Sequence, residues 1–249
     1  MIEVLLSCMH NNVHTLIKRT NIITHGIIIN QCEEDNTYNV NKINVFNTTE
    51  RGLSKSRNMA LRNASGDICL ICDDDEILDN DYSEKIEQAY KENPSADVIA
   101  FQIQDAGKKY PNKKKRIRYI GALKLASWQL TFRRKSIIDN NIRFDETLGS
   151  GVSKAGGEEN MFVYDCLKKG LKVIFVPVTI GRMIEGDSQW FHGYTPEYFY
   201  DRGIMTRKLM GSFWASLYAI YFLSFKYKSY HNDVRVMSAT NRIFSGIFN

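Results

Sequence analysis

Short apolar runs alternate with amphipathic stretches along the first two thirds of the chain. The apolar runs predict strands, and the stretches with apolar residues every three or four positions predict helices. Because strands and helices alternate, the pattern is typical of βαβ units and predicts an α/β fold. The predicted strands are 3–7, 26–30, 43–46, 68–72, 98–104 and 171–176, and the predicted helices are 13–22, 54–64, 82–92 and 158–169.

One apolar run, 68–72, shows no alternation and is followed by four acidic residues, 73–76. A run without alternation predicts a strand covered on both faces, as in a parallel or mixed sheet. The acids then lie at its carboxyl end, the edge where open α/β sheets bind ligands. Their mutual repulsion requires a cation or a hydrogen-bond network, and oxygen ligands suit Mg²⁺ or Mn²⁺. The alternative is a solvated turn that caps the next helix.

The helix before this strand ends at Ser65-Gly66. A glycine directly after a helix is typical of a left-handed cap, so we expect Gly66 to have a positive φ. The chain then passes from helix to strand as in a βαβ unit.

A second acidic pair, Glu158-Glu159, follows two glycines at the start of a predicted helix. Carboxylates in a first helical turn are common because they offset the helix dipole. A carboxylate pair can also separate its two pKa values, which leaves one member able to accept a proton from a substrate hydroxyl. Both interpretations stay open for this pair.

Composition places the chain among ordinary globular proteins. Its 249 residues are 43% hydrophobic and 24% charged, enough for one large domain or a domain with an appendage. The five cysteines are odd in number and irregularly spaced, and the N-terminus lacks signal-peptide features, so we expect a reducing cytoplasm. Cys69 and Cys72 would face opposite sides of a strand, which excludes a shared metal.

The net charge of +5 is concentrated in the stretch 108–118. This stretch lacks interleaved aromatic residues, and no helix-turn-helix or zinc-finger spacing occurs elsewhere, so no nucleic-acid partner is predicted. A solvated loop is the plain interpretation, and an anionic membrane surface is the favoured partner.

Residues 209–225 carry no charge and are rich in aromatic side chains, with basic residues on both sides. The stretch is at the lower limit for spanning a bilayer and includes Gly, Ser and Tyr. It predicts a helix lying at a membrane interface, and the alternative is a helix that packs on the rest of the chain or on a second subunit of a homo-oligomer.

Three motifs occur in a recognisable order: Gly-Leu-Ser-Lys-Ser-Arg-Asn at 52–58, Gly66-Asp67 leading to Asp73-Asp74-Asp75, and Gly-Glu-Glu at 157–159. Together they resemble the family 2 glycosyltransferases with the GT-A fold, of the type that builds bacterial surface polysaccharides. The resemblance covers roughly residues 1–200. It implies a Rossmann-like, mostly parallel mixed sheet flanked by helices. The domains expected are a catalytic domain at 1–200, with a donor part at 1–105 and an acceptor part at 106–200, and a helical C-terminal appendage at 201–249.

The resemblance also assigns roles around the Asp-x-Asp (DXD) motif. Asp73 and Asp75 would contact the donor ribose and a divalent metal, Mn²⁺ or Mg²⁺, with Asp75 as the first metal ligand. His192 is a candidate third ligand. The donor-binding residues implied are Ser7, Asn30, Arg57, Asp73, Asp74 and Asp75.

Glu159 aligns with the catalytic base of the family, although the family more usually has Asp there, and Glu158 is the alternative base. Trp128 is either a core aromatic residue or a platform for an acceptor sugar.

These roles predict a metal-dependent, inverting glycosyltransferase of the hexosyltransferase type. It would move a sugar from a nucleoside diphosphate donor, with UDP expected, to a hydroxyl of a glycan or polyprenol-linked acceptor. The reaction is expected in the cytoplasm or at the inner face of the cell membrane. The alternatives are a sugar-phosphate nucleotidyltransferase and a non-catalytic, membrane-peripheral protein that binds sugar nucleotides.

Overall fold

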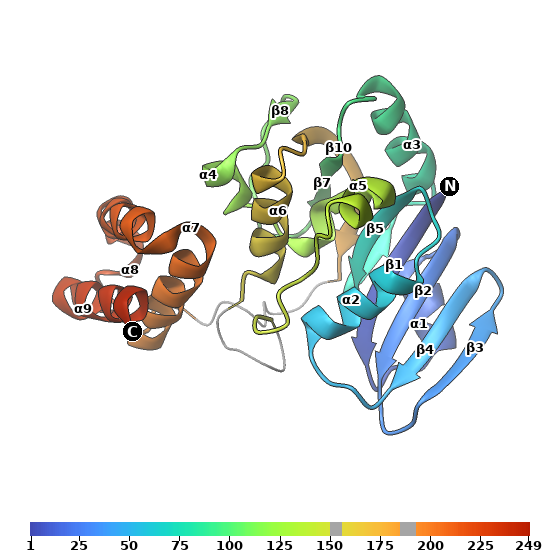
Figure 1. Cartoon of the computed structure of the whole chain (residues 1–249), viewed down its shortest axis with the longest axis horizontal. Coiled ribbons are helices and arrows are strands. Elements are labelled where there is room, and N and C mark those ends of the chain that lie inside the picture. The colour runs from blue at the N-terminus through green and yellow to red at the C-terminus, as the bar shows by residue number, and fades with distance from the viewer. Residues whose placement is uncertain (150–155, 185–192) are drawn as a thin grey trace. The chain divides into compact units, whose positions relative to one another are not determined.

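A computed structural model describes residues 1–149, 156–184 and 193–249. The chain divides into two compact units (Figure 1). The first comprises Met1–Glu146 and Glu158–Glu185, and the second comprises Thr147–Gly157 and Gly186–Asn249. The first carries a β-sheet and the second is helical.

The first unit is built on one mixed sheet. Its strands are β1 (Ile2–Met9), β2 (His25–Gln31), β3 (Asn36–Val40), β4 (Ile43–Thr48), β5 (Ile68–Asp73), β6 (Glu76–Leu78), β7 (Val98–Gln104), β8 (Lys115–Arg116), β9 (Leu130–Arg133) and β10 (Val173–Met183). The order across the sheet is β3-β4-β2-β1-β5-β9-β7-β10-β6, with β8 paired to β10. Strands β4, β2, β1 and β5 run parallel, as do β7 and β10. Because β9 is antiparallel to both β5 and β7, those two strands end at the same edge.

Helices cover both faces of this sheet. They are α1 (Val13–Thr20), α2 (Leu53–Asn63), α3 (Tyr82–Glu92), α4 (Tyr119–Ala122), the 3₁₀ turn η1 (Ser127–Gln129), α5 (Arg134–Asp139) and α6 (Glu158–Lys168). Leu16 of α1 and Ile86 of α3 join the same core cluster as Val4 and Leu6 of β1. Helix α2 contacts β1 and β2 and lies in front of the sheet in Figure 1. The predicted α/β fold class, with a mostly parallel mixed sheet, is confirmed.

The turn between α2 and β5 is closed by a buried carboxylate of β1. Glu3 Oε2 accepts hydrogen bonds from the backbone N–H groups of Ser65 and Gly66, both at 2.6 Å. Gly66 does not have the positive φ expected from the sequence. A Cβ at this position would lie 2.5 Å from the Cβ of Glu3, so the close approach of the two backbones explains the glycine.

The late strand differs from its prediction at Pro177. The sequence placed the end of this strand before the proline, yet β10 continues to Met183. Its pairing with β7 shifts register between Phe175 and Thr179, and a bulge of this kind tolerates a proline that cannot donate a hydrogen bond. The sequence pattern missed β3, whose residues are mostly exposed, and the four-residue β9.

The second unit contains α7 (Pro196–Phe225), α8 (Tyr227–Tyr230) and α9 (Val236–Phe248). Gly211, with a φ of 75°, interrupts α7. Gly203 of α7 and Gly246 of α9 face each other so closely that a Cβ on either would overlap the backbone of the other helix. None of the described helices combines the length and hydrophobicity needed to cross a membrane.

Candidate active site

The ends of three parallel strands bring polar residues to one edge of the sheet. Ser7 of β1 stands beside Asp73 of β5, and Asn30 of β2 stands beside Cys8 of β1. Ser7 and Asn30 are buried. The Ser7 hydroxyl has no hydrogen-bond partner within the described residues, whereas the Asn30 side chain bonds to the backbone of Asn11 and to Asn47.

The acidic segment after β5 forms a tight turn in which each carboxylate has different surroundings. Asp74 Oδ2 accepts a hydrogen bond from Asn11 Nδ2 at 2.9 Å. Glu76 is fully buried, and its Oε1 accepts from the backbone N–H of Asp73 at 3.0 Å. Asp75 is exposed, and no other described residue donates a hydrogen bond to its carboxylate. Desolvation of the carboxylate by the surrounding turn and the charge of Asp73 raise the pKa of Asp75.

Arg57 of α2 joins the two acidic segments. Its Nη2 donates to Asp73 Oδ1 at 2.8 Å and its Nη1 donates to Glu158 Oε1 at 2.9 Å, although the two acids are far apart in sequence. The Arg57 side chain is 2% exposed. Burial alone would lower the pKa of Arg57, but the charges of Asp73 and Glu158 outweigh it and raise this pKa. Arg57 is therefore the charged centre on which both acidic segments are fixed.

Two residues hold this centre in place: Asn58, which the sequence placed in the 52–58 motif without a role, and Ser127, which the sequence did not indicate. Asn58 donates to the carbonyl of Phe144 and accepts from its N–H, both at 2.9 Å, and the Phe144 ring centroid lies 5.6 Å from the Arg57 guanidinium carbon. Ser127 Oγ donates to Asp73 Oδ2 at 2.8 Å. The burial of polar Ser127 between apolar neighbours could not be recognised from the sequence pattern alone.

Glu158 and Glu159 begin α6, and their environments differ. Glu158 is buried and bound to Arg57. Glu159 is half-buried, and no other described residue donates a hydrogen bond to its carboxylate. Burial and the charge of Glu158, partly offset by Arg57, raise the pKa of Glu159 to about 8. A carboxylate with this pKa is suited to accept a proton near neutral pH.

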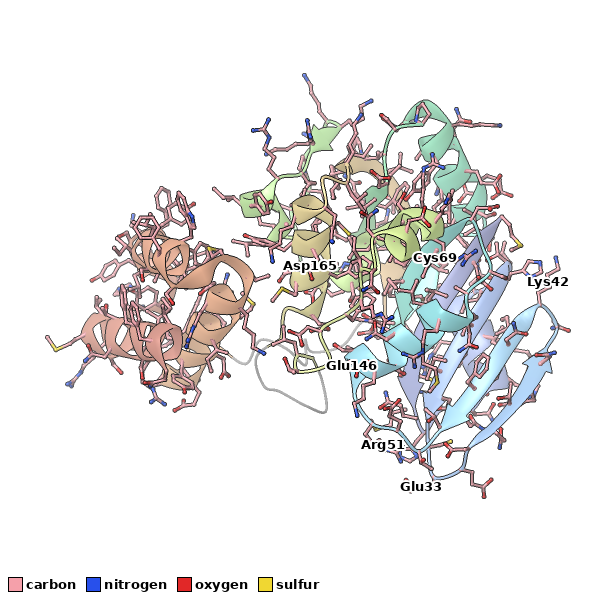
Figure 2. All side chains as sticks on the ribbon, viewed as in Figure 1. Glu33, Lys42, Arg51, Cys69, Glu146 and Asp165 are labelled. Carbon is pink, nitrogen blue, oxygen red and sulfur yellow. The ribbon has the colours of Figure 1, made fainter. Side chains whose placement is uncertain are left out.

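The sequence also drew attention to Trp128, to the cysteines Cys69 and Cys72, and to His192. Trp128 is partly buried, packs against the core, and has the ammonium of Lys108 5.4 Å from its ring centroid. Cys69 (labelled in Figure 2) and Cys72 are both buried free cysteines. His192 lies outside the described residues.

The donor atoms at the end of β5 fit a divalent cation that arrives with a phosphate ligand. No three His, Cys, Asp or Glu side chains in the described part of the chain gather closely enough to hold a metal by themselves. Mg²⁺ is commonly held by one or two carboxylates together with substrate phosphates. Asp75 offers such a carboxylate, because no other described residue donates a hydrogen bond to it and it lies beside further negative charge.

Comparison with solved structures identifies similar folds. The S. aureus TarS fragment 1–349 in complex with UDP-GlcNAc is 16% identical with a TM-score of 0.59, covering 93% of this chain and 74% of that one. The same fragment in complex with UDP is 15% identical with a TM-score of 0.58 and covers 93% and 73%. S. aureus TarS itself is 16% identical with a TM-score of 0.61, and the match spans 44% of its length. At this identity the likeness concerns the fold.

Comparison with protein families gives a direct assignment. No curated protein sequence matches the chain significantly. The model described as Glycosyl transferase family 2 matches residues 6–155, a range that contains Arg57 and the acids that follow β5 and ends before Glu158. Since this match covers more than half of the sequence, the chain belongs to glycosyl transferase family 2.

Proposed function

We propose that this glycosyltransferase moves a hexose from a nucleoside diphosphate sugar to a hydroxyl of a glycan or polyprenol-linked acceptor. The observation that carries the proposal is the Arg57 bridge, which brings the acids after β5 and those of α6 to one place. The similar TarS structures contain UDP-GlcNAc and UDP, which supports a UDP-sugar as the donor of this chain. We assign catalysis to the first unit and treat the helical unit as an appendage.

The nucleoside would lie over the ends of β1, β2 and β5, bordered by Ser7, Asn30 and Asp73. The Ser7 hydroxyl, which has no hydrogen-bond partner among the described residues, supports this placement, since a buried polar group requires such a partner. Both oxygens of Asp73 accept a protein hydrogen bond, and each keeps a further lone pair that a ribose hydroxyl can use. Asp74 shapes the turn through Asn11.

Asp75 would hold Mn²⁺ or Mg²⁺ together with the donor phosphates. When bound, the ion supplies positive charge against the charge that develops on the departing diphosphate. Arg57 would keep Asp73 in position for this arrangement through its hydrogen bond to Asp73 Oδ1. A contribution of His192 to the metal site remains a prediction from the family resemblance.

Glu159 would act as the base in a single displacement. Its carboxylate takes the proton of the acceptor hydroxyl, whose oxygen bonds to the anomeric carbon as the bond from that carbon to the diphosphate oxygen breaks. Attack opposite the leaving group inverts the configuration. Glu159 suits this role better than Glu158, because Glu158 is already bound to Arg57.

The test is nucleoside diphosphate release from a panel of sugar nucleotides with Mn²⁺ and then with EDTA. Release from one donor that is abolished by EDTA and by Asp75→Asn would support the metal-dependent reaction. Glu87→Gln, an exposed acid of α3, is the matched control and should keep full activity. Failure of every donor to bind in calorimetry would contradict the proposal.

The outward face of α7 supports a location at an anionic membrane surface. After Gly211, one face of α7 packs into the helical core through Ala215, Ala219 and Phe222. The opposite side exposes large apolar residues, among them Trp214 at 62% and Phe225 at 74%. Residues 202–249 contain seven Lys or Arg and one acid, so this charge and the aromatic side chains both suit anionic headgroups.

Sedimentation with vesicles tests this location. The protein should pellet with phosphatidylglycerol vesicles but not with phosphatidylcholine vesicles, and Trp214→Glu should abolish pelleting. Ile120→Glu, which alters an exposed apolar residue of α4, is the control and should pellet as the wild type does. Loss of a dimer in Trp214→Glu without any vesicle binding by the wild type would instead assign the face to a second copy of the chain.

A further inference from the structure

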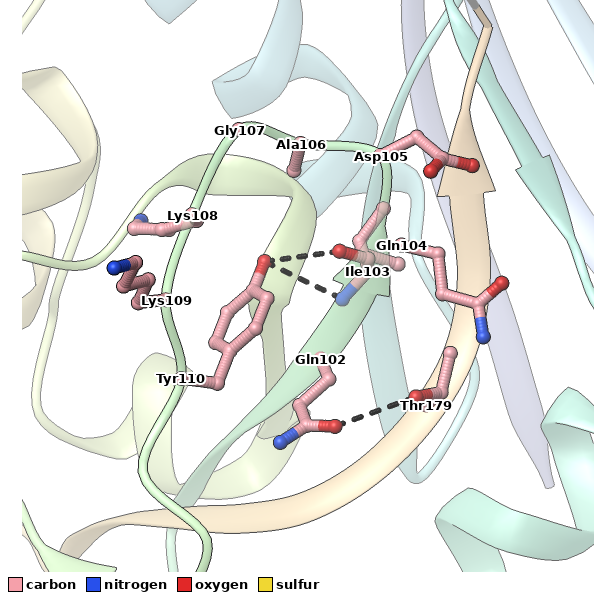
Figure 3. A pocket seen from close by; sticks show the side chains of 10 residues that line it. All are labelled: Gln102, Ile103, Gln104, Asp105, Ala106, Gly107, Lys108, Lys109, Tyr110 and Thr179. Atoms are coloured by element: carbon pink, nitrogen blue, oxygen red, sulfur yellow. Dashed lines mark hydrogen bonds between the residues drawn. The ribbon is translucent and has the colours of Figure 1, made fainter.

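Polar side chains lie at the carboxyl ends of the strands on both sides of β5. On one side they line a cavity of about 440 Å³ at the end of β7, where the Tyr110 hydroxyl bonds to the backbone of Ile103 and Thr179 donates to Gln102 (Figure 3). In the described part of the chain, no side chain lining this cavity bonds to the acids 73–76. On the other side, asparagines at the ends of β1, β2 and β4 do reach these acids.

The buried amide of Asn30 holds the backbone of Asn11 from both sides. Asn30 Oδ1 accepts from the Asn11 N–H at 3.1 Å, and Asn30 Nδ2 donates to the Asn11 carbonyl at 3.3 Å. Because a backbone N–H only donates and a carbonyl only accepts, these two bonds also fix the direction in which the amide faces. Asn30 Nδ2 donates further to Asn47 Oδ1 at 3.0 Å, so Asn11 is tied to both β2 and β4.

The side chain of Asn11 extends from this fixed position to the acidic turn. Its Nδ2 donates to Asp74 Oδ2 at 2.9 Å and to the carbonyl of Met9 at 3.2 Å. Its Oδ1 accepts from Arg19 Nη2 at 3.5 Å, and the same Nη2 donates to the Asp74 carbonyl at 2.9 Å. Asp74 is therefore held at its carboxylate and at its backbone, next to a cationic side chain.

The backbone on either side of Asp74 is also fixed. The Asp73 N–H donates to Glu76 Oε1 at 3.0 Å, and the Asp75 carbonyl accepts from the Ile184 N–H at 2.7 Å. Because the turn is held at each residue, the contacts of its side chains decide which carboxylate is available to a ligand. The carboxylates of Asp73 and Asp74 accept hydrogen bonds from protein side chains, whereas that of Asp75 accepts none from another described residue.

We propose that Asn11 is a positioning residue that determines which aspartate of the turn meets the metal. The proposal rests on the proposed function, because it concerns the divalent cation assigned there to Asp75. Asn11 keeps the Asp74 carboxylate occupied with a charge-assisted hydrogen bond, which this carboxylate would have to lose in order to turn toward an ion. Arg19 adds a positive charge beside Asp74, which disfavours a metal cation there. The Asp75 carboxylate is then left for the cation and the donor phosphates.

The test asks whether Asp74 becomes a metal ligand once Asn11 no longer holds it. Asn11→Leu removes the amide at similar volume and adds no charge. Protein saturated with UDP is titrated with Mn²⁺, and electron paramagnetic resonance measures the free ion. Asp75→Asn alone should weaken Mn²⁺ binding about tenfold or more, because the other aspartates of the turn are bound to protein groups.

The combination of the two substitutions gives the decisive comparison. Asn11→Leu/Asp75→Asn should bind Mn²⁺ about tenfold more tightly than Asp75→Asn, because the freed Asp74 carboxylate replaces the missing ligand. A loss of structure cannot strengthen binding in this way. The addition of Asp74→Asn should remove the gain, and Asn11→Ala in place of Asn11→Leu should give the same order of affinities. Asn44→Leu/Asp75→Asn, changed at an exposed asparagine near the start of β4, is the matched control and should bind as weakly as Asp75→Asn.

Four outcomes would contradict these assignments, and they are distinguishable. If Asp75→Asn weakens Mn²⁺ binding equally with and without Asn11, the proposal is overturned. If the gain persists after Asp74→Asn, the ion is held elsewhere and the proposal is also overturned. If the wild type binds no Mn²⁺ in the presence of UDP, the metal assignment of the proposed function fails together with this inference. If UDP does not bind, the donor assignment fails, and titration of the protein with Mn²⁺ alone decides the role of Asn11.

Discussion

At the end of β5 and at the start of α6, acidic residues stand next to one another, and in each place one carboxylate is bound to Arg57. Asp73 and Glu158 are these bound members, and their neighbours Asp75 and Glu159 accept no hydrogen bond from another described residue. The pKa values of Asp75 and Glu159 are both raised. The comparison teaches that contact with Arg57, rather than residue type, separates the positioning carboxylates from those available for chemistry.

Removal of the shared cation should have the largest effect. Arg57→Met leaves two carboxylates partly or fully buried without their counterion, so we expect the free energy of unfolding to fall by about 3–5 kcal/mol. Urea denaturation measures this change. Arg62→Met, on the exposed side of the same helix, should change it by less than about 0.5 kcal/mol. A loss below about 1 kcal/mol in Arg57→Met would refute the central role of this residue.

Substituting each of the two glutamates by glutamine should show that one is needed for activity and the other for stability. Glu159→Gln removes the proposed base, so we expect transfer to slow by about 100-fold to 10,000-fold with donor affinity unchanged. Glu158→Gln should instead lower stability, because Arg57 loses a charged partner. Steady-state transfer rates, donor calorimetry and urea denaturation of both variants measure these effects. Full activity of Glu159→Gln would exclude Glu159 as the base.

The same contrast is expected between the two aspartates, with a smaller effect. Asp73→Asn weakens the charge-assisted bond to Arg57 and should cost about 1–3 kcal/mol of unfolding free energy. Asp75→Asn removes no hydrogen bond from another described residue and should change the free energy of unfolding by less than about 0.5 kcal/mol, while donor binding loses its dependence on Mn²⁺. Thermal melting and calorimetry with and without EDTA compare the two variants. Equal stability losses would mean that Asp75 also has a structural role.

The smallest expected effect is that of the raised Glu159 pKa on the pH dependence of the free energy of unfolding. Its pKa rises from 4.5 to about 8 on folding, so between these values the folded protein binds more protons than the unfolded chain. The free energy of unfolding contributed by this group must therefore fall as the pH rises from about 4.5 to about 8. Urea denaturation from pH 5 to pH 8 should show a smaller decline in Glu159→Gln than in the wild type. Identical slopes would contradict the raised pKa.

Much of this arrangement follows from local sequence patterns. The apolar run at 68–72 and the acids after it predicted a covered strand that delivers carboxylates to the sheet edge, and β5 has this form. The register between Ser7 and Asp73 follows from parallel pairing of two such strands. The sequence did not reveal that Arg57 joins Asp73 to Glu158, because this bridge spans 101 positions and depends on tertiary packing.

Other differences have local physical reasons. Pro177 suggested the end of a strand because it cannot donate to a ladder, but a bulge in β10 accommodates it. Gly66 suggested a helix cap, whereas its lack of a side chain serves the approach of Glu3. At Pro177 the residue does mark an irregularity of the backbone, whereas at Gly66 the expected cap is absent and the glycine instead allows the close approach of β1.

The contact between Glu3 and Gly66 sets the register between β1 and β5. It fixes β1 against β5 at the end of the strands remote from the site, and the paired residues then follow in order until Ser7 meets Asp73. A slip of one residue would turn every side chain of β5 to the opposite face. The alignment of Ser7 with Asp73 therefore depends on the Glu3 carboxylate, which lies several residues away at the other end of the strands.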